Sequence, residues 1–352
     1  MNPQEQLLQY PHGDVLPEPG SSIELAPGVR WLRMPLPFAL DHINLWLLRD
    51  CIDGREGWTI VDCGISRDEV KTLWEQVFST QLEGLPVLRV IVTHMHPDHV
   101  GLANWLCERW NVPLYMSMTD FMTAKLWSVR TEGGASGGES AVKHFTRHGL
   151  VDPESQEKIR ARASYYSGMV PSVPNSFIRI LDGSRLEIGG HVWQAIAGYG
   201  HAPEHMSLYC ADKNVLISGD MVLPRISTNV SVFDFEPMGN PLPLYLSSLD
   251  AYQPLPLDTL VLPSHGRPFK GLHERIAQQH AHHAERLQEV LDACVTPQST
   301  TDILPVLSKR KLDLHQTTFA MGEAIAHLHA LYFDGKLSRQ VGDDGIIRFT
   351  SV

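Results

Sequence analysis

The stretch THMHPDHVG, residues 93–101, decides the fold class, because it places four side chains able to bind a metal within six residues. An apolar, strand-like run precedes it and an amphipathic helix follows. We expect His94 and His96 to point to the same side, since side chains alternate along an extended chain. The turn into the helix would bring Asp98 and His99 to the same point. A surface histidine cluster is the alternative, but four metal-competent residues at a strand–helix junction favour a zinc-type site.

Further ligand-type residues follow other strand-like runs of the chain. Each of them alone is typical of an ordinary turn, and only their order along the chain makes them a constellation. They are Asp62 in VDCG after residues 58–60, His201 and His205 in GHAPEH after residues 191–197, Asp220 in SGD after residues 215–217, and His265 in PSHG after residues 259–262.

This order of residues resembles the metallo-β-lactamase superfamily over roughly residues 30–270. The resemblance implies an α/β fold, an αββα sandwich of two sheets with helices outside and a dinuclear metal site at one edge. It also implies the following ligands: His94, His96 and His201 for the first metal, Asp98, His99 and His265 for the second, and Asp220 as the bridge.

Two more residues have supporting roles by the same resemblance. Asp62 corresponds to the acid that orients a ligand histidine, and His205 to a position that supports the site without binding metal. We therefore expect both side chains beside the ligands rather than among them.

Departures from known branches of the superfamily narrow the reaction. Asp220 stands where true di-zinc β-lactamases carry no bridging Asp, which disfavours hydrolysis of antibiotics. His96 stands where flavin-dependent di-iron relatives carry Glu, which disfavours a redox di-iron role. The last ligand lies in LPSHGRPF, which differs from the GHEY-type sequence of glutathione-thioester hydrolases and disfavours glyoxalase II itself. The resemblance then implies a hydrolase of the glyoxalase II/lactonase-like branch that cleaves an ester, thioester or lactone bond of a small molecule.

The expected mechanism depends on two divalent metals that share a water and lower its pKa towards about 7. The bridging hydroxide would attack the carbonyl carbon, and Asp98 is the predicted catalytic residue that moves the proton. Zinc suits the nitrogen-rich ligands best, while iron and manganese stay open. A single-iron sulfur (persulfide) dioxygenase, an RNA phosphodiesterase and a non-catalytic binding module are the alternatives.

Composition bears on partners and location. The chain has 352 residues and a formal net charge of −11, which disfavours nucleic acid as a partner. The single basic triplet, residues 309–311, is a weak case for it. No apolar run reaches the roughly 20 residues of a membrane span, and the first residues lack the pattern of a secretory signal. Five scattered cysteines without a CxxC pair indicate reduced thiols. We expect a cytoplasmic protein with a small-molecule substrate and leave a homodimer open.

The chain is expected to form two domains. Residues 1–274 would be the metallohydrolase domain with an insertion at about 117–175, and residues 275–352 a small, mostly helical, winged-helix-like domain. Tyr165 and Tyr166 of the insertion, together with Tyr199, are predicted to line the substrate cleft; packing of the insertion onto the main domain is the equally favoured alternative.

Local patterns predict three further features. The first thirty residues are expected to form a surface lead-in. Ser66 and Glu69 have the spacing of a capping box and predict a helix that begins at Ser66. His280 and His283 fall on the apolar stripe of a C-terminal helix, which favours packed core histidines over a second metal site.

Overall fold

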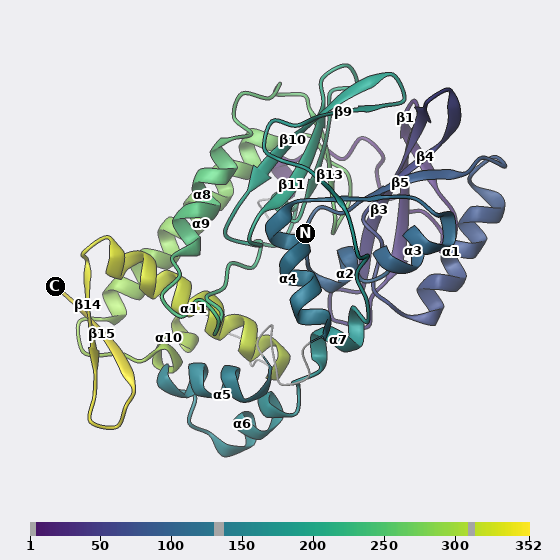
Figure 1. Ribbon diagram of the computed structural model, residues 1–352. Coiled ribbons are helices and arrows are strands. Elements are labelled where there is room, and N and C mark those ends of the chain that lie inside the picture. Colours follow the sequence, from purple (N-terminus) through teal and green to yellow (C-terminus); the bar gives the residue numbers. More distant parts are fainter. Residues whose placement is uncertain (1–4, 130–136, 309–313) are drawn as a thin grey trace. The chain divides into compact units, whose positions relative to one another are not determined.

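The computed structural model describes residues 5–129, 137–308 and 314–352, so the basic triplet and most of the GGASGG stretch at 133–138 lie outside the described residues. The chain divides into two compact units (Figure 1). The first consists of Met1–Val129, Gly168–Thr228 and Ser248–Ile276, and the second of Arg130–Ser167, Asn229–Ser247 and Ala277–Val352.

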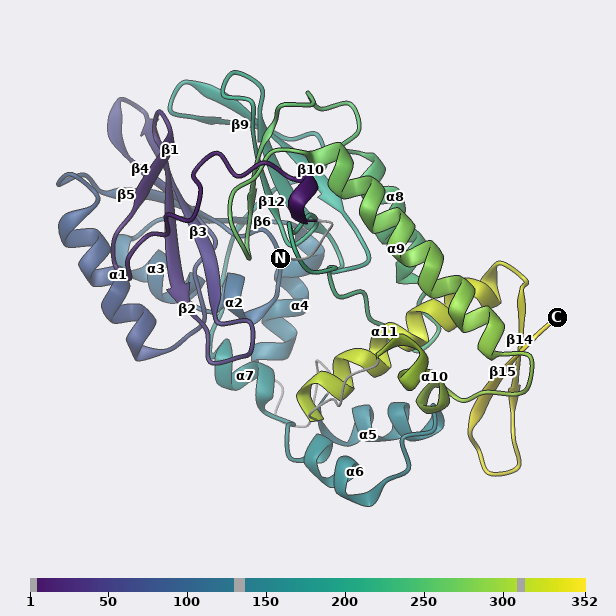
Figure 2. The same cartoon turned by 180° about the vertical axis from the view of Figure 1, so that it is seen from behind.

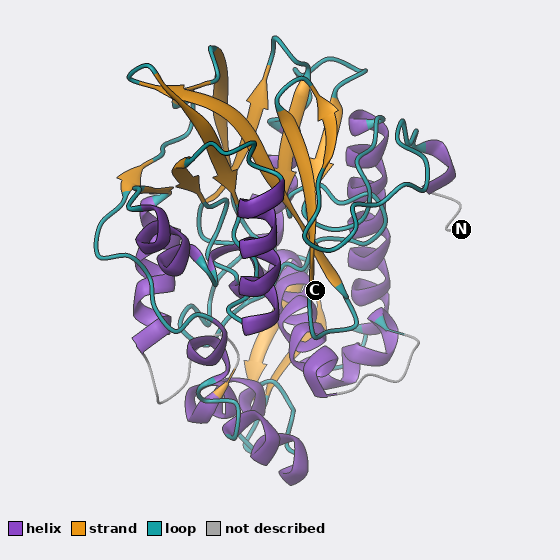
Figure 3. Ribbon diagram, turned by 90° about the vertical axis from the view of Figure 1, so that its right-hand side faces the viewer, coloured by secondary structure: helices purple, strands orange, loops and turns teal. Residues whose placement is uncertain are grey.

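The first unit contains two β-sheets, whose strands are orange in Figure 3. The larger sheet has seven strands, antiparallel from β1 to β4 and parallel from β4 to β8. In sheet order they are β1 (Ile23–Ala26), β2 (Val29–Pro35), β3 (His42–Ile52), β4 (Arg55–Val61), β5 (Val87–Ile91), β6 (Leu114–Met116) and β8 (Ile178–Arg179).

The smaller sheet has five strands, of which only β12 and β13 run parallel. In sheet order they are β13 (Leu260–Pro263), β12 (Val215–Gly219), β11 (His205–Cys210), β10 (His191–Gly198) and β9 (Arg185–Ile188).

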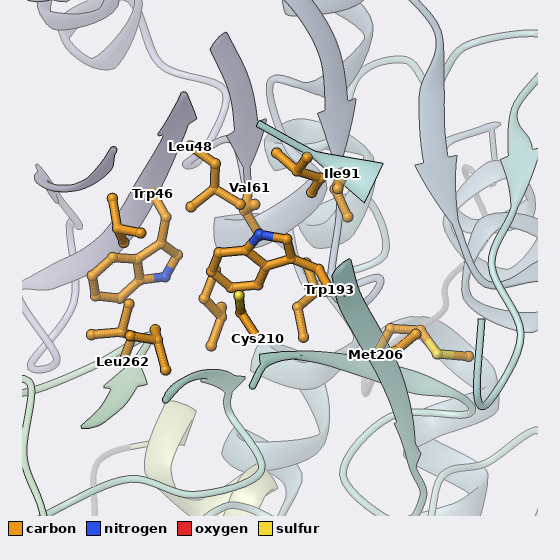
Figure 4. Close-up of a cluster of buried hydrophobic side chains, with 14 of the residues drawn as sticks. Trp46, Leu48, Val61, Ile91, Trp193, Met206, Cys210 and Leu262 are labelled. Carbon is orange, nitrogen blue, oxygen red and sulfur yellow. The ribbon is translucent and has the colours of Figure 1, made fainter. Parts of the chain in front are cut away.

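Apolar side chains from both sheets form a shared core. Figure 4 shows Trp46 and Val61 of the larger sheet facing Trp193 and Leu262 of the smaller one. Each of these side chains is almost fully buried, so the tryptophans alone remove several hundred Å² of apolar surface from water. This core holds the two sheets face to face. The strand ends that precede the predicted ligands therefore all belong to the first unit.

Helices complete the first unit. They are the 3₁₀ turn at Glu5–Leu7, α1 (Asp68–Thr80), α2 (Pro97–Val100), α3 (Ala103–Trp110) and α4 (Met118–Val129). Trp74 of α1 donates from Nε1 to the Cys63 carbonyl at 2.8 Å, which fixes that helix to the end of β4. The sandwich of two sheets with helices confirms the αββα fold class.

The second unit is mostly helical, with one β-hairpin (Figure 2). Its helices are α5 (Gly138–Arg147), α6 (Pro153–Arg160), most of α7 (Tyr165–Met169), part of α8 (Pro241–Asp250), most of α9 (Leu272–Ala293), α10 (Thr300–Leu307) and α11 (Leu314–Phe333), and its hairpin is β14 (Leu337–Val341) with β15 (Ile347–Ser351). The order of α10, α11 and hairpin confirms the predicted C-terminal helical domain.

The second unit is discontinuous in sequence, unlike the continuous domains predicted at 1–274 and 275–352. Residues 137–167, expected in the insertion of the first domain, belong to it, and hydrogen bonds join them to the C-terminal helices. His148 shows this: its Nδ1 lies 3.0 Å from Thr300 Oγ1, and its carbonyl accepts from the Thr301 amide at 3.2 Å. Such pairings between distant segments leave no trace in local sequence.

Two local predictions were wrong. The helix α1 begins at Asp68 with Arg67 as its N-cap, and no side chain caps it, so Ser66 and Glu69 form no capping box. The segment predicted as a lead-in contributes β1 and the start of β2, in which Val29 is fully buried. The apolar residues in that segment are few, and its strands are recognisable only from their pairing, β1 with β2 and β2 with β3. Among the described helices, none combines the length and apolarity needed to cross a bilayer.

Candidate metal centre

Asp62 follows the last residue of β4 with a φ of 61°, a left-handed conformation that Asp tolerates better than most residues. This turn sends the fully buried carboxylate back under the neighbouring loop. Its Oδ1 accepts from the Thr93 amide at 2.8 Å, and its Oδ2 lies 2.8 Å from His99 Nδ1. His99 is thereby held with Nδ1 occupied and Nε2 available, which is the arrangement that orients a metal-binding imidazole.

The loop after β5 carries the first histidines. β5 ends at Ile91, so His94 and His96 lie in the irregular segment between the strand and α2 rather than at the end of the strand itself. Their rings nevertheless meet, with His94 Nε2 2.9 Å from His96 Nδ1. The two imidazoles thus lie on the same side, as predicted, although β5 has already ended. Pro97 then starts α2, whose single turn presents Asp98 and His99.

The smaller sheet supplies three more of the predicted residues. His201 follows β10, and its Nε2 lies 3.2 Å from His94 Nε2. His205 begins β11, and its Nε2 accepts from the Asp220 amide at 3.2 Å. A Cβ on Gly219 would lie 2.1 Å from that Nε2, so only glycine admits the ring there. His205 therefore lies against the backbone that carries Asp220, and its supporting role stays a prediction.

The loop after β13 holds His265 through two residues that the sequence analysis missed. His265 Nδ1 donates to the His42 carbonyl at 2.7 Å, and the Gly266 amide donates to His42 Nε2 at 2.8 Å. Asn44 Nδ2 donates to the Pro263 and Gly266 carbonyls at 2.8 and 2.9 Å. Asn44 could have been recognised as the one amide side chain in the otherwise apolar run INLWLL. Nothing in the sequence distinguishes His42 from the rest of the 18 histidines.

The seven predicted ligands gather into two groups of donor atoms, each within 4.8 Å of one another. One group is His94, His96, His201 and Asp220, and the other is Asp98, His99 and His265. Asp220 faces both groups, because its Oδ2 lies 3.3 Å from His201 Nε2 and its Oδ1 lies 3.5 Å from both His99 Nε2 and His265 Nε2. This geometry fits the predicted bridge.

Buried atoms without partners show that the donor set suits cations. His99 Nε2 and Asp220 Oδ1 are buried and make no hydrogen bond with the described residues. Leaving such atoms unsatisfied costs free energy, and a metal ion would satisfy both. The two Nε2 atoms of His94 and His201 also face each other at hydrogen-bonding distance, an arrangement that a shared cation would stabilise. Imidazole and carboxylate donors of this kind suit zinc, iron and manganese.

The charges differ between the two groups. Burial and the neighbouring His201 lower the pKa of His96 to about 3, and burial likewise holds the pKa of His94 well below its usual value. Both rings are therefore neutral, the form that binds metals. In the other group burial opposes the charge on His265, but Asp220 and Asp98 outweigh it and raise the pKa to about 10.

The three tyrosines predicted to line the cleft fall in different units. Tyr199 follows β10 in the first unit, with 39% of its surface exposed, and its amide donates to Ser248 Oγ at 2.9 Å. Tyr165 and Tyr166 begin α7 in the second unit, where Tyr166 is buried and Tyr165 stacks under the Arg162 guanidinium. Their contact with substrate stays a prediction.

Comparison with known proteins agrees with this geometry. The family pattern described as "Metallo-beta-lactamase superfamily" matches residues 39–265, and "Metallo-beta-lactamase-like, C-terminal domain" matches residues 287–352. The chain is 55% identical to a beta-lactamase domain protein from Burkholderia ambifaria, whose crystal structure matches 100% of both chains with a TM-score of 0.94.

More distant relatives point the same way. A metallo-beta-lactamase family protein from Thermus thermophilus is 25% identical, covers 94% of this chain and 100% of its own, and has a TM-score of 0.76. The probable metallo-hydrolase YqjP of Bacillus subtilis is 24% identical over 318 residues, which are 85% of this chain and 91% of that protein. The matched family pattern covers all seven predicted ligands and every strand of the two sheets except β1 and β2. The chain therefore belongs to the metallo-beta-lactamase superfamily.

Proposed function

We propose that this metal-dependent hydrolase holds two divalent ions and cleaves an ester, thioester or lactone bond of a small molecule. One observation carries the proposal: two groups of donor atoms lie side by side and share the carboxylate of Asp220. A single ion would need only one of these groups, so the second group favours a dinuclear site.

The predicted ligands keep their roles in this proposal. His94, His96 and His201 would hold one ion, Asp98, His99 and His265 the other, and Asp220 both. When bound, the ions supply Lewis acidity and lower the pKa of water, so that a nucleophile is available at neutral pH. Zinc is the preferred metal because five of the seven ligands are imidazoles, and iron and manganese are the alternatives.

Asp98 is the proposed catalytic residue because it is the most accessible carboxylate of the centre. Its side chain is 18% exposed, against 10% for Asp220 and 0% for Asp62. Burial opposes its charge, but His99 and His265 outweigh this effect and lower the pKa of Asp98 to about 2, so the group is an acceptor. It would take a proton from the attacking water and return it to the leaving oxygen or sulfur.

Metal content and hydrolysis test the proposal together. Purified protein should contain about two metal ions per chain by mass spectrometry and should hydrolyse at least one member of a panel of esters, thioesters and lactones. The variant His94→Ala/His96→Ala should lose the first ion and the hydrolysis. The matched control is His191→Ala, which alters a half-buried histidine at the other end of β10 and should change neither quantity.

Two results would overturn the proposal. The first is a metal content well below one ion per chain after reconstitution with zinc, manganese or iron. The second is undiminished hydrolysis by the double variant. A content of one iron per chain, with oxygen consumption on a persulfide and no hydrolysis, would instead select the single-iron sulfur dioxygenase.

We further propose a cytoplasmic location and a small-molecule substrate rather than nucleic acid. The five cysteines are free thiols, which suits a reducing compartment, and the net charge of −11 disfavours phosphate backbones. Fractionation of cells and a salt-dependent RNA-binding assay test these two points.

A further inference from the structure

Asp120 is a buried carboxylate to which the proposed reaction gives no role. It lies in the first turn of α4 and has no exposed surface. Burying a charged group without partners is costly, so the partners of this carboxylate indicate what it does. Its Oδ1 accepts from the Met95 amide at 2.8 Å, and its Oδ2 accepts from the Glu204 amide at 2.6 Å.

These two amides lie in the two loops that carry the first group of donors. Met95 stands between His94 and His96, and Glu204 stands between His201 and His205. One carboxylate therefore joins the loop after β5 to the loop after β10, directly at their ligands. Hydrogen bonds of this kind, between a charged acceptor and backbone amides, are among the stronger ones in proteins.

A second contact joins the same parts in the opposite direction. The Glu204 carboxylate accepts from Thr119 Oγ1 at 3.0 Å and from the Thr119 amide at 3.4 Å. The N-terminal turn of α4 and the loop after β10 thus hold each other through Asp120 and through Glu204. Both contacts lie wholly within the first unit.

The second group of donors is held by other residues. His99 is oriented by Asp62, and His265 by the His42 carbonyl. Within the described residues, the Asp120 carboxylate has one more side-chain partner, Ser117, whose Oγ lies 3.3 Å from Oδ2. Ser117 does not hold the second group of donors. The loss of Asp120 should consequently disturb one half of the centre and spare the other.

We propose that Asp120 is a positioning residue that sets the spacing of His94 and His96 from His201, and so the affinity of the first metal. This inference rests on the proposed dinuclear site. Replacement of supporting residues around metal ligands typically weakens metal binding by about 10–100-fold.

The test compares Asp120→Asn with Asp50→Asn in the full chain. Asn keeps the shape of the side chain but presents an NH₂ group to one of two backbone donors, so one of the two loops is released. Asp50 is a suitable control because it is equally buried and accepts from the Cys51 and Gly189 amides and from Arg89, remote from the ligands. Both variants should lower the melting temperature, which separates general stability from metal positioning.

Zinc affinity, measured by competition with a chromophoric chelator, is the main readout. Asp120→Asn should bind one zinc ion about 10–100-fold more weakly and the other within about threefold of wild type, whereas Asp50→Asn should bind both normally. The absorption spectrum of the cobalt(II) protein should change in Asp120→Asn alone. Unchanged binding of both ions, or equal weakening of both, would overturn the inference and leave the proposed function standing.

Amide hydrogen exchange on the metal-free protein gives a readout that needs no metal, and its wild-type arm does not depend on whether the variant folds. The Met95 and Glu204 amides should both be strongly protected in wild type, and in Asp120→Asn the amide that faces the new NH₂ group should lose its protection. Exchange of either amide at the rate of an exposed one in wild type would overturn the inference. Strong protection together with a failure to bind metal would reject the proposed function and keep the link between the two loops.

Discussion

Histidines gather in both compact units, but their ring nitrogens face different groups: other candidate metal ligands in the first unit, and protein hydrogen-bond partners in the second. In the first unit, five rings and two carboxylates direct donor atoms at two shared points. In the second unit, rings bond to the protein through one nitrogen: His329 Nδ1 lies 2.8 Å from the Gly239 carbonyl, and His283 Nδ1 lies 3.2 Å from His327 Nε2. Among the described residues, both groups able to hold a metal belong to the first unit.

Carboxylates make the difference between these two sets of histidines. Asp98 and Asp220 raise the pKa of His265 to about 10, so a positive charge is favoured at that point. In the second unit, burial lowers the pKa of His148 to about 2 and that of His283 to about 3. These rings are neutral packing groups. A high histidine content alone therefore does not indicate a metal site; acidic residues at the same point do.

The comparison is tested most strongly by removing one histidine from each unit. His201→Ala should lose an ion and reduce kcat/KM by about 1,000-fold or more, since a metal contributes several kcal/mol to the transition state. His283→Ala should keep both ions and most of the activity, while its free energy of unfolding falls by about 1–3 kcal/mol. Metal analysis, kinetics and denaturation measure the three quantities. Metal loss in His283→Ala would remove the distinction between the two sets.

A smaller effect is expected for Asp62→Asn. Asn tolerates the φ of 61° at this position, so the backbone should keep its conformation while the charge that orients His99 is removed. We expect metal affinity to fall by about 10–100-fold, mainly for the ion that His99 binds. Competition with a chelator checks this. Weaker binding of the other ion alone would contradict this prediction, because Asp62 would then support the half of the centre that does not contain His99.

The seven candidate ligands could be predicted from sequence because they follow strand-like runs, of the larger sheet or of the smaller one, in an order that resembles the superfamily. His42, Asn44 and Asp120 could not, because each acts through a backbone group distant in sequence: Asn44 reaches the Pro263 carbonyl, and Asp120 the Glu204 amide. The two sheets were predicted through the family resemblance, whereas the discontinuous second unit was not predicted.

Acid should destabilise the second unit through its neutral histidines. The pKa of His283 is about 3 in the folded protein, lowered by burial and then by His327, and about 6.5 when unfolded. Below pH 6.5 His283 binds a proton in the unfolded state but not in the folded state. The free energy of unfolding therefore falls by up to about 1.4 kcal/mol for each unit by which the pH is lowered. His283→Asn removes this contribution. The difference in free energy of unfolding between wild type and His283→Asn should narrow by about 1 kcal/mol per pH unit as the pH falls from 6.5 to 5. Urea unfolding in the presence of a chelator measures this difference. A constant or widening difference would contradict the prediction.

The smallest expected effect contrasts two serines, one in each unit. Ser299 forms a true capping box at the start of α10: its side chain accepts from the Asp302 amide, and the Asp302 carboxylate accepts from the Ser299 amide at 2.8 Å. Ser299→Ala should therefore lower the free energy of unfolding by about 1 kcal/mol with metal affinity unchanged. Ser66→Ala should change it by less than about 0.5 kcal/mol, because α1 begins at Asp68 and no side chain caps it. Denaturation of the two variants side by side measures both values, and an equal loss in both would restore the capping box that the spacing of Ser66 and Glu69 predicted. The spacing is the same in the two segments, so the distinction comes from the backbone: Ser299 is the residue before the first helical turn, whereas at α1 that place is taken by Arg67.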